Sequence, residues 1–99
     1  MDLSEEMQPH IDRLRQAGFN PIAVSFMLGE YVFVFETDEE AHEAFIYSEV
    51  EGNIVPGWWY SRQGIKEAVD WYERAMDVVV EVYWLVEQTP ENNTENQTT

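Results

Sequence analysis

The amino-acid sequence predicts an α+β fold, with an antiparallel three- or four-stranded sheet and about three helices in the order α-β-β-α-(β)-α-β. Two observations carry this prediction. Two strongly apolar segments are separated by a turn signal, and helix-capping residues twice precede an apolar stripe of helical spacing. We expect the helices to pack on one face of the sheet, and a ferredoxin-like variant is one topology that this order allows.

The first predicted helix is defined by apolar residues spaced four, four and three apart, which form one stripe: Leu3, Met7, Ile11 and Leu14. Gly18 is a plausible terminator of this helix. Pro9 lies inside the stripe, which leaves two interpretations. Either the regular helix starts near Gln8 with Pro9 in its first turn, or the helix is kinked.

A β-hairpin follows the Asn20-Pro21 turn, with strands over residues 22–28 and 31–35. Gly29-Glu30 fits a two-residue loop with glycine first, the type II′ pattern. The first strand is expected to place four apolar residues on one face: Ile22, Val24, Phe26 and Leu28. Both strands are also apolar on the opposite face. Either the first helix or a partner covers that face, and homodimerisation through a sheet face or edge is one hypothesis.

The second helix begins at a capping box in which Thr37 is followed three residues later by Glu40. It is expected to run to near Ser48, with its inward residues at Ala41, Ala44 and Phe45. Residues 51–57 are rich in turn formers and predict a loop, and residues 58–60 predict a short extended segment.

Ser61 can cap the third helix, whose predicted core stripe is Ile65, Ala68, Val69, Tyr72 and Met76. The last strand is expected over residues 78–86, with alternate residues from Val78 to Val86 on one face. Residues 88–99 are polar and contain Pro90 at their start. We therefore expect a single α+β domain over residues 1–87 and a disordered polar tail over residues 88–99.

Composition excludes several classes of protein. The 99 residues contain no cysteine, which removes disulfide scaffolds, zinc ribbons and thiol catalysis. Five basic and twenty acidic residues give a net charge of −15, so we expect no direct contact with nucleic acid and none with an anionic membrane. The N-terminus is acidic where a signal peptide is basic, and no apolar run reaches the ~20 residues of a membrane span. We expect a cytoplasmic protein, in the host cytoplasm if a phage encodes it.

Catalytic and metal-binding motifs are weak. His42 follows Glu39 at the spacing of helical metal sites, but His10 is the only other histidine in the sequence. A histidine on a solvated acidic helix explains this spacing as well. The serines have no triad context, and the glycines form no phosphate loop. We expect no enzymatic activity, no cofactor and no metal.

Charge patterning is the sharpest signal, because no Lys or Arg lies between Arg15 and Arg62 while eight acids do. Consecutive aromatic residues at 58–60 cannot all point inward, and Trp and Tyr are enriched at binding hot spots. The candidate partner-binding residues are therefore acids on or beside the second helix together with these aromatic residues: Glu36, Asp38, Glu39, Glu40, Glu43, Glu49, Glu51, Trp58, Trp59 and Tyr60.

Carboxylates without neighbouring cations can occupy a channel built for phosphates. In composition, although not in any motif, the chain resembles the small acidic proteins that phages and mobile elements use against host enzymes, including anti-restriction, anti-CRISPR and polymerase-inhibiting proteins. These features predict a non-enzymatic inhibitor whose partner is a basic-surfaced host nuclease, polymerase or guided effector. The alternative is a small homodimeric structural or accessory domain whose charge serves solubility or high-salt adaptation.

Overall fold

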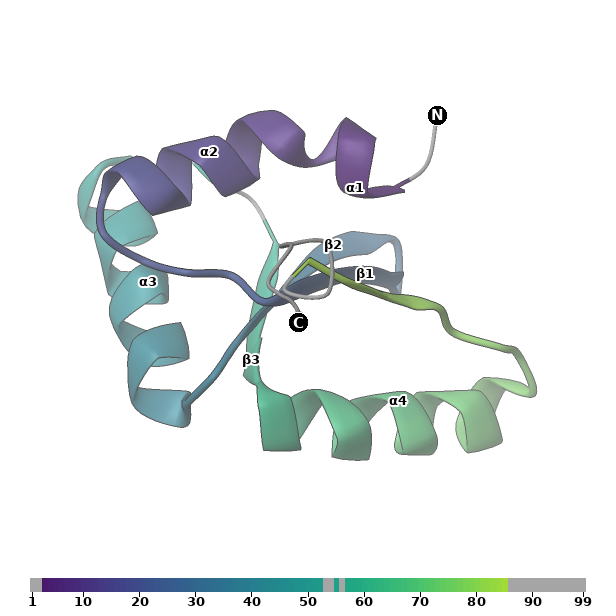
Figure 1. Cartoon of the computed structure of the whole chain (residues 1–99). Coiled ribbons are helices and arrows are strands. Elements are labelled where there is room, and N and C mark those ends of the chain that lie inside the picture. Colours follow the sequence, from purple (N-terminus) through teal and green to yellow (C-terminus); the bar gives the residue numbers. More distant parts are fainter. Residues whose placement is uncertain (1–2, 53–54, 56, 86–99) are drawn as a thin grey trace, which may run out of the picture.

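The structure of the protein is a computed structural model, and the residues it describes are 3–52, 55 and 57–85. Its elements are α1 (Leu3–Glu6), α2 (Gln8–Gln16), β1 (Ala23–Met27), β2 (Glu30–Phe35), α3 (Asp38–Val50), β3 (Trp58–Ser61), α4 (Arg62–Met76) and β4 (Val82–Trp84) (Figure 1). The strands form one sheet in the order β3-β2-β1-β4. The predicted α+β class and element order are confirmed, and the optional strand is present.

The sheet is mixed, not fully antiparallel. β1 pairs antiparallel with both β2 and β4, whereas β2 and β3 are parallel. α3 connects these two parallel strands, so β2-α3-β3 is a βαβ unit that joins neighbours in the sheet. The ferredoxin-like variant is therefore wrong, because its βαβ units are split by an intervening strand.

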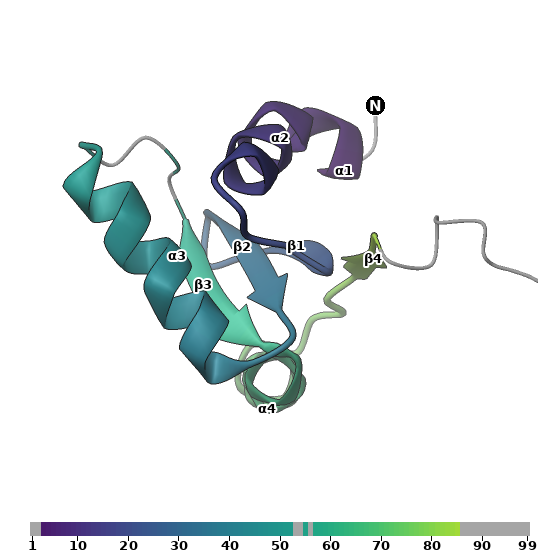
Figure 2. The ribbon, with the colours of Figure 1, turned by 60° about the vertical axis from the view of Figure 1, so that its left-hand side comes forward.

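Helices cover both faces of the sheet, and the expectation that they share one face is wrong. Figure 2 shows α1 and α2 on one side, α4 on the other side, and α3 alongside β3. The α2 face buries Met7, Ile11, Leu14, Val24, Phe33, Phe35, Ala41, Ala44, Val55 and Leu85. The α4 face buries Ile22, Ala23, Met27, Val32, Val34 and Ile65. The chain itself thus covers both apolar faces, with the first predicted helix on one side and α4 on the other.

The hairpin turn differs from the predicted one by one residue. Met27 pairs with Glu30, so the two-residue loop is Leu28-Gly29. Both loop residues have positive φ, 53° for Leu28 and 76° for Gly29. Positive φ at both positions is the type I′ pattern, whose twist matches that of the flanking strands. Leu28 therefore lies in the turn and not on the face that Val24 shares, and Phe26 is also exposed.

The N-terminal stripe is confirmed, and the structure decides between the two interpretations of Pro9. Helical structure is interrupted at Met7, and Pro9 lies in the first turn of α2, where its missing N–H removes no intrahelical hydrogen bond. Met7, Ile11 and Leu14 are fully buried on the α2 face. Leu3 in the preceding single-turn helix packs at the margin of the same cluster.

Both predicted N-caps are confirmed. The Thr37 hydroxyl accepts from the Glu40 N–H at 3.1 Å, and the Ser61 hydroxyl accepts from the Gly64 N–H at 2.9 Å. Two residues predicted to point inward are exposed instead, Phe45 in α3 and Met76 in the last turn of α4. None of the helices in the described ranges is long and apolar enough to cross a bilayer.

The last strand is shorter than predicted within the described residues. β4 spans Val82–Trp84, and its pairing with β1 is extended by the Leu85 N–H, which donates to the Ile22 carbonyl at 2.8 Å. Val80, Val82 and Trp84 share one face as predicted, and this is the α4 face. Val78 is exposed, because it follows directly on the left-handed C-cap of α4 and lies outside the sheet. The expectations for Val86 and for the tail over residues 88–99 lie outside the described residues.

Replacing Leu28 by asparagine is expected to stabilise the protein by about 1 kcal/mol, because leucine at positive φ is strained and Asn-Gly is the preferred type I′ pair. Urea unfolding followed by circular dichroism measures the change. Val79→Asn is the control, since Val79 is exposed outside the sheet, and we expect it to stay within about 0.5 kcal/mol of the wild type. A Leu28→Asn variant no more stable than the wild type would contradict the assigned turn.

Candidate partner-binding site on α3 and β3

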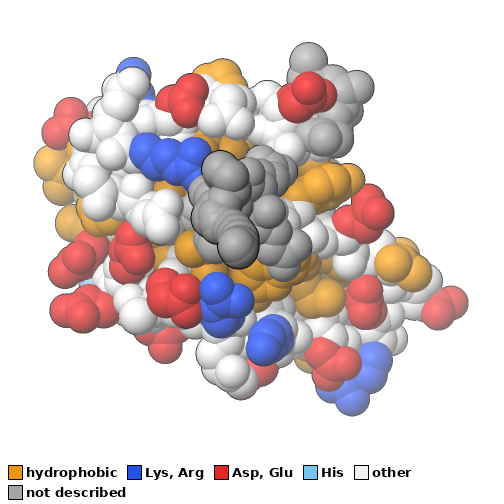
Figure 3. All heavy atoms as spheres, in the orientation of Figure 1, with side chains coloured by type: hydrophobic (Ala, Val, Ile, Leu, Met, Phe, Trp, Pro, Cys, Tyr) orange, Lys and Arg blue, Asp and Glu red, His pale blue; other side chains and the backbone are white. Residues whose placement is uncertain are grey.

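α3 carries five acids and no basic residue over its 13 positions. Three of the acids, Asp38, Glu39 and Glu40, lie in the first turn, where the helix dipole favours negative charge. Glu43 and Glu49 continue the exposed acidic surface toward the C-terminus of the helix. Figure 3 shows acidic side chains gathered over this side of the molecule, with apolar side chains beside them.

Two of the predicted site acids have internal roles. Glu36 accepts two hydrogen bonds from the Arg62 guanidinium, at 2.9 and 3.1 Å. These hydrogen bonds hold the pKa of the Glu36 carboxyl below its ordinary value. Glu40 accepts from the Asn20 backbone N–H at 2.7 Å and so joins α3 to the loop before β1. The candidate acids that remain on the exposed surface are Asp38, Glu39, Glu43, Glu49 and Glu51.

Apolar side chains interrupt this acidic surface. Phe45, Ile46 and Val50 are exposed on α3, and Val50 is 75% exposed. Ile46 and Val50 are candidate binding residues that the predicted site does not include. The signal was present, because both lie off the inward row that contains Ala41 and Ala44. The outer surface of α3 is therefore both acidic and apolar.

The aromatic segment forms β3, and its residues alternate between the two sides of the sheet. Trp59 stacks on Phe33, with ring centroids 5.2 Å apart, and belongs to the α2 face. Tyr60 packs on the α4 face, and burial raises the pKa of its phenol. Trp58 is partly exposed on the same side as Tyr60. The prediction that these three rings do not all point inward is confirmed.

Two contacts position β3, one with α3 and one with β2. The buried Ser48 hydroxyl of α3 donates to the Val55 carbonyl at 2.9 Å and accepts from the Val55 N–H at 3.2 Å, which holds the approach to β3. Gly57 precedes the strand with φ of 135°, and a Cβ there would lie 2.7 Å from the Tyr31 carbonyl oxygen. Only glycine allows the chain to enter β3 this close to β2.

A pocket of about 270 Å³ opens between α3 and β3 and brings the acidic helix and the aromatic strand together. Its lining residues are Asp38, Ala41, His42, Phe45, Trp59, Tyr60, Ser61 and Gly64. The Phe45 ring lies 6.5 Å from the rings of both His42 and Trp59. Three of the predicted site residues, Asp38, Trp59 and Tyr60, meet here. We call this the α3–β3 pocket.

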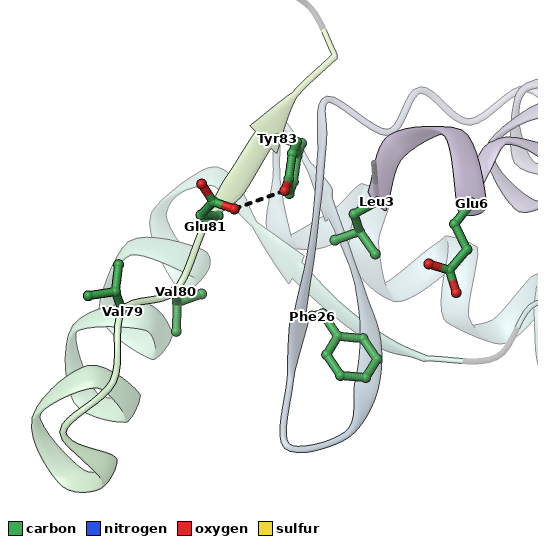
Figure 4. Close-up of a pocket in the computed structure, with 7 residues that line it drawn as sticks. All are labelled: Leu3, Glu6, Phe26, Val79, Val80, Glu81 and Tyr83. Carbon is green, nitrogen blue, oxygen red and sulfur yellow. Dashed lines mark hydrogen bonds between the residues drawn. The ribbon is translucent and has the colours of Figure 1, made fainter. Parts of the chain in front are cut away.

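A second pocket, of about 400 Å³, lies between α1, the end of β1 and the segment that leads into β4 (Figure 4). Two carboxylates line it, and both are already hydrogen-bonded to tyrosines. Glu6 accepts from Tyr31 at 2.7 Å, and Glu81 accepts from Tyr83 at 2.9 Å. None of the predicted site residues lines this pocket, so it is not the candidate site.

The two histidines lie in different surroundings. The His10 ring lies 5.8 Å from Tyr31 and 6.4 Å from Phe33, whereas His42 lines the α3–β3 pocket. Within the described ranges, no group of three or more His, Asp or Glu side chains is arranged to hold a metal ion. The lining of the α3–β3 pocket combines one carboxylate, three aromatic rings and one imidazole.

No protein-family model, no curated protein and no solved structure matches this chain.

Replacing Glu36 by glutamine is expected to lower stability at neutral pH, because the charge that holds Arg62 is lost. The folded-state pKa of Glu36 is lowered from 4.5, so the ion pair stabilises the fold above that pH and loses this effect as the pH falls through the lowered pKa. The difference in thermal midpoint between wild type and Glu36→Gln should therefore shrink in acid. Glu43→Gln is the control, because it removes one negative charge at a position away from Arg62. Parallel wild-type and Glu36→Gln profiles across this pH range would contradict the role of the pair.

Proposed function

We propose that this protein is a non-enzymatic interaction protein that binds a basic surface of a nucleic-acid-binding protein and competes there with nucleic acid. One observation carries the proposal: α3 exposes acids without any basic residue of its own, directly beside a pocket lined with aromatic rings. Such a surface fits a nuclease, a polymerase or a guided effector. Phage-type anti-restriction, anti-CRISPR or polymerase-inhibiting proteins act in this way, in the host cytoplasm.

The two kinds of side chain have separate roles in the proposed complex. Exposed carboxylates such as Glu39 and Glu43 attract the basic partner over a distance and speed the encounter. Phe45 and the rings of the α3–β3 pocket make short-range apolar contacts that slow dissociation. Mimicry of phosphates accounts for the charge, and the apolar residues account for the choice of one basic partner among many.

The alternative is a homodimeric accessory domain whose charge serves solubility or high-salt adaptation. The covered sheet weakens one reason for the alternative, because helices of the chain itself bury both faces and leave neither to a partner. The exposed Ile46 and Val50 favour it, since apolar residues on a helix surface also suit a two-fold interface. Sedimentation equilibrium separates the two: the inhibitor proposal expects 11.7 kDa at micromolar concentration, and a dimeric mass that persists on dilution supports the accessory domain.

Reversing Glu39 and Glu43 to lysine is expected to weaken partner binding by about tenfold or more, since both charges lie on the proposed contact surface. The partner is captured from a bacterial lysate by the tagged protein, identified, purified and titrated by calorimetry. Reversal of Glu91 and Glu95 changes the net charge equally and is the matched control. Glu40 is left unchanged because it bonds Asn20.

The same titration tests competition with nucleic acid. Duplex DNA should displace the captured partner, and affinity should fall steeply as the salt concentration rises. A complex that is indifferent to both DNA and salt overturns phosphate mimicry. Equal losses in the α3 variant and the control variant would show that net charge alone drives binding.

A further inference from the structure

A third and smaller opening, a cleft, lies on the other side of β3 from the α3–β3 pocket. Its volume is about 40 Å³, and it is formed by the hairpin turn, β3 and α4. Five of its lining residues form what we call the aromatic cleft: Leu28, Trp58, Tyr60, Trp71 and Tyr72. The buried Met27 also lines it. Four aromatic side chains from two elements therefore converge on one small opening.

Three residues of the aromatic cleft expose large apolar areas. Trp71 is 59% exposed, Leu28 is 47% exposed and Trp58 is 39% exposed. Trp71 lies off the α4 stripe that contacts the sheet, so core packing does not explain it. Neighbouring exposed side chains of this size mark an interaction surface more often than a solvated one.

The turn residue adds an independent observation. Leu28 has a φ of 53° in a type I′ turn, a position that favours asparagine, aspartate or glycine. Leucine is strained there and leaves 47% of its surface exposed, so an asparagine or glycine would suit the turn better. Strain of this kind is characteristic of binding sites. In the cleft, Leu28 instead extends the apolar wall beside Trp58 and Trp71.

The chemistry of the cleft favours a cation. The faces of indole and phenol rings are negative and attract guanidinium groups, and the chain as a whole carries a charge of −15. The protein already contains such an arrangement, since the Arg62 guanidinium lies 5.2 Å from the centre of the Trp84 ring. The volume suits the head of one side chain and is far below the roughly 300 Å³ of a cofactor site.

We infer that the aromatic cleft receives an arginine side chain from the basic protein partner, with the guanidinium against the indole rings of Trp58 and Trp71. This inference rests on the proposed function for the source of the arginine. It adds a second contact point, separated from the α3–β3 pocket by the thickness of β3. The partner would then hold β3 from both sides.

The test uses the whole ¹⁵N-labelled chain without its partner. N-acetyl-arginine amide is titrated at constant ionic strength, and N-acetyl-citrulline amide, which has the same shape without the charge, is the comparison. The sequence contains four tryptophans, so four indole N–H signals report separately. We expect saturable shifts at Trp58 and Trp71, and binding of the arginine derivative about two- to fivefold tighter than that of citrulline. Equal binding of the two compounds, or shifts centred on Trp59, would overturn the inference.

Three variants distinguish a loss of arginine binding from a loss of folding. Trp71→Leu retains apolar bulk at an exposed position and should abolish the preference for arginine over citrulline. Phe26→Leu removes an exposed ring elsewhere and should retain that preference. Leu28→Asn should weaken arginine binding, although we expect it to stabilise the fold. An unchanged preference in Trp71→Leu would contradict the assignment.

The free amino-acid derivatives also separate this inference from the proposed function. If the cleft binds arginine while α3 charge reversal leaves partner capture unchanged, the proposed α3 surface fails and the cleft stands. If reversal of the α3 charges abolishes partner capture while the cleft does not bind arginine, the inference about the cleft fails and the proposed α3 surface stands.

Discussion

The apolar character of both faces of the central hairpin is the constraint on which the rest of the structure depends. Val24, Phe33 and Phe35 point to one side, Val32 and Val34 point to the other, and all five are fully buried. A sheet of this kind is stable only when both sides are covered, because exposure of either side would leave large apolar areas in water. The helices therefore pack their apolar stripes against the sheet. Most of the acidic residues in the described part of the chain are left on the outside, where their charges face solvent.

The sequence was sufficient to predict the elements that are encoded locally. Thr37 and Ser61 precede helices with the expected caps, and two apolar segments around a turn form the hairpin. The parallel pairing of β3 could not be predicted, because the direction of a four-residue strand depends on the α3 crossover and on the Ser48–Val55 contact. The turn was placed one residue late, because register along the whole hairpin, and not the glycine alone, decides which residues form the loop.

The candidate site was predictable as a set of residue types and less so as a geometry. The sequence indicates that the acids on the second predicted helix and the aromatic residues after it are candidates for partner binding. The α3–β3 pocket brings two of them, Asp38 and Trp59, together. It does not indicate that Arg62 pairs with Glu36, since these residues are separated by 26 positions. The apolar stripe predicted for the third helix does not include Trp71. Its place beside Trp58 depends on the packing of α4 against the sheet.

Tyr60 lines both the α3–β3 pocket and the aromatic cleft, so a single side chain forms part of the wall between two openings. Any occupant that shifts this ring on one side alters the shape available on the other. Thermodynamic linkage then requires the effect to be reciprocal: each occupant changes the affinity for the other by the same factor. In the proposed complex, a strand of four residues would therefore couple the two contacts energetically, so that a change at one opening is felt at the other.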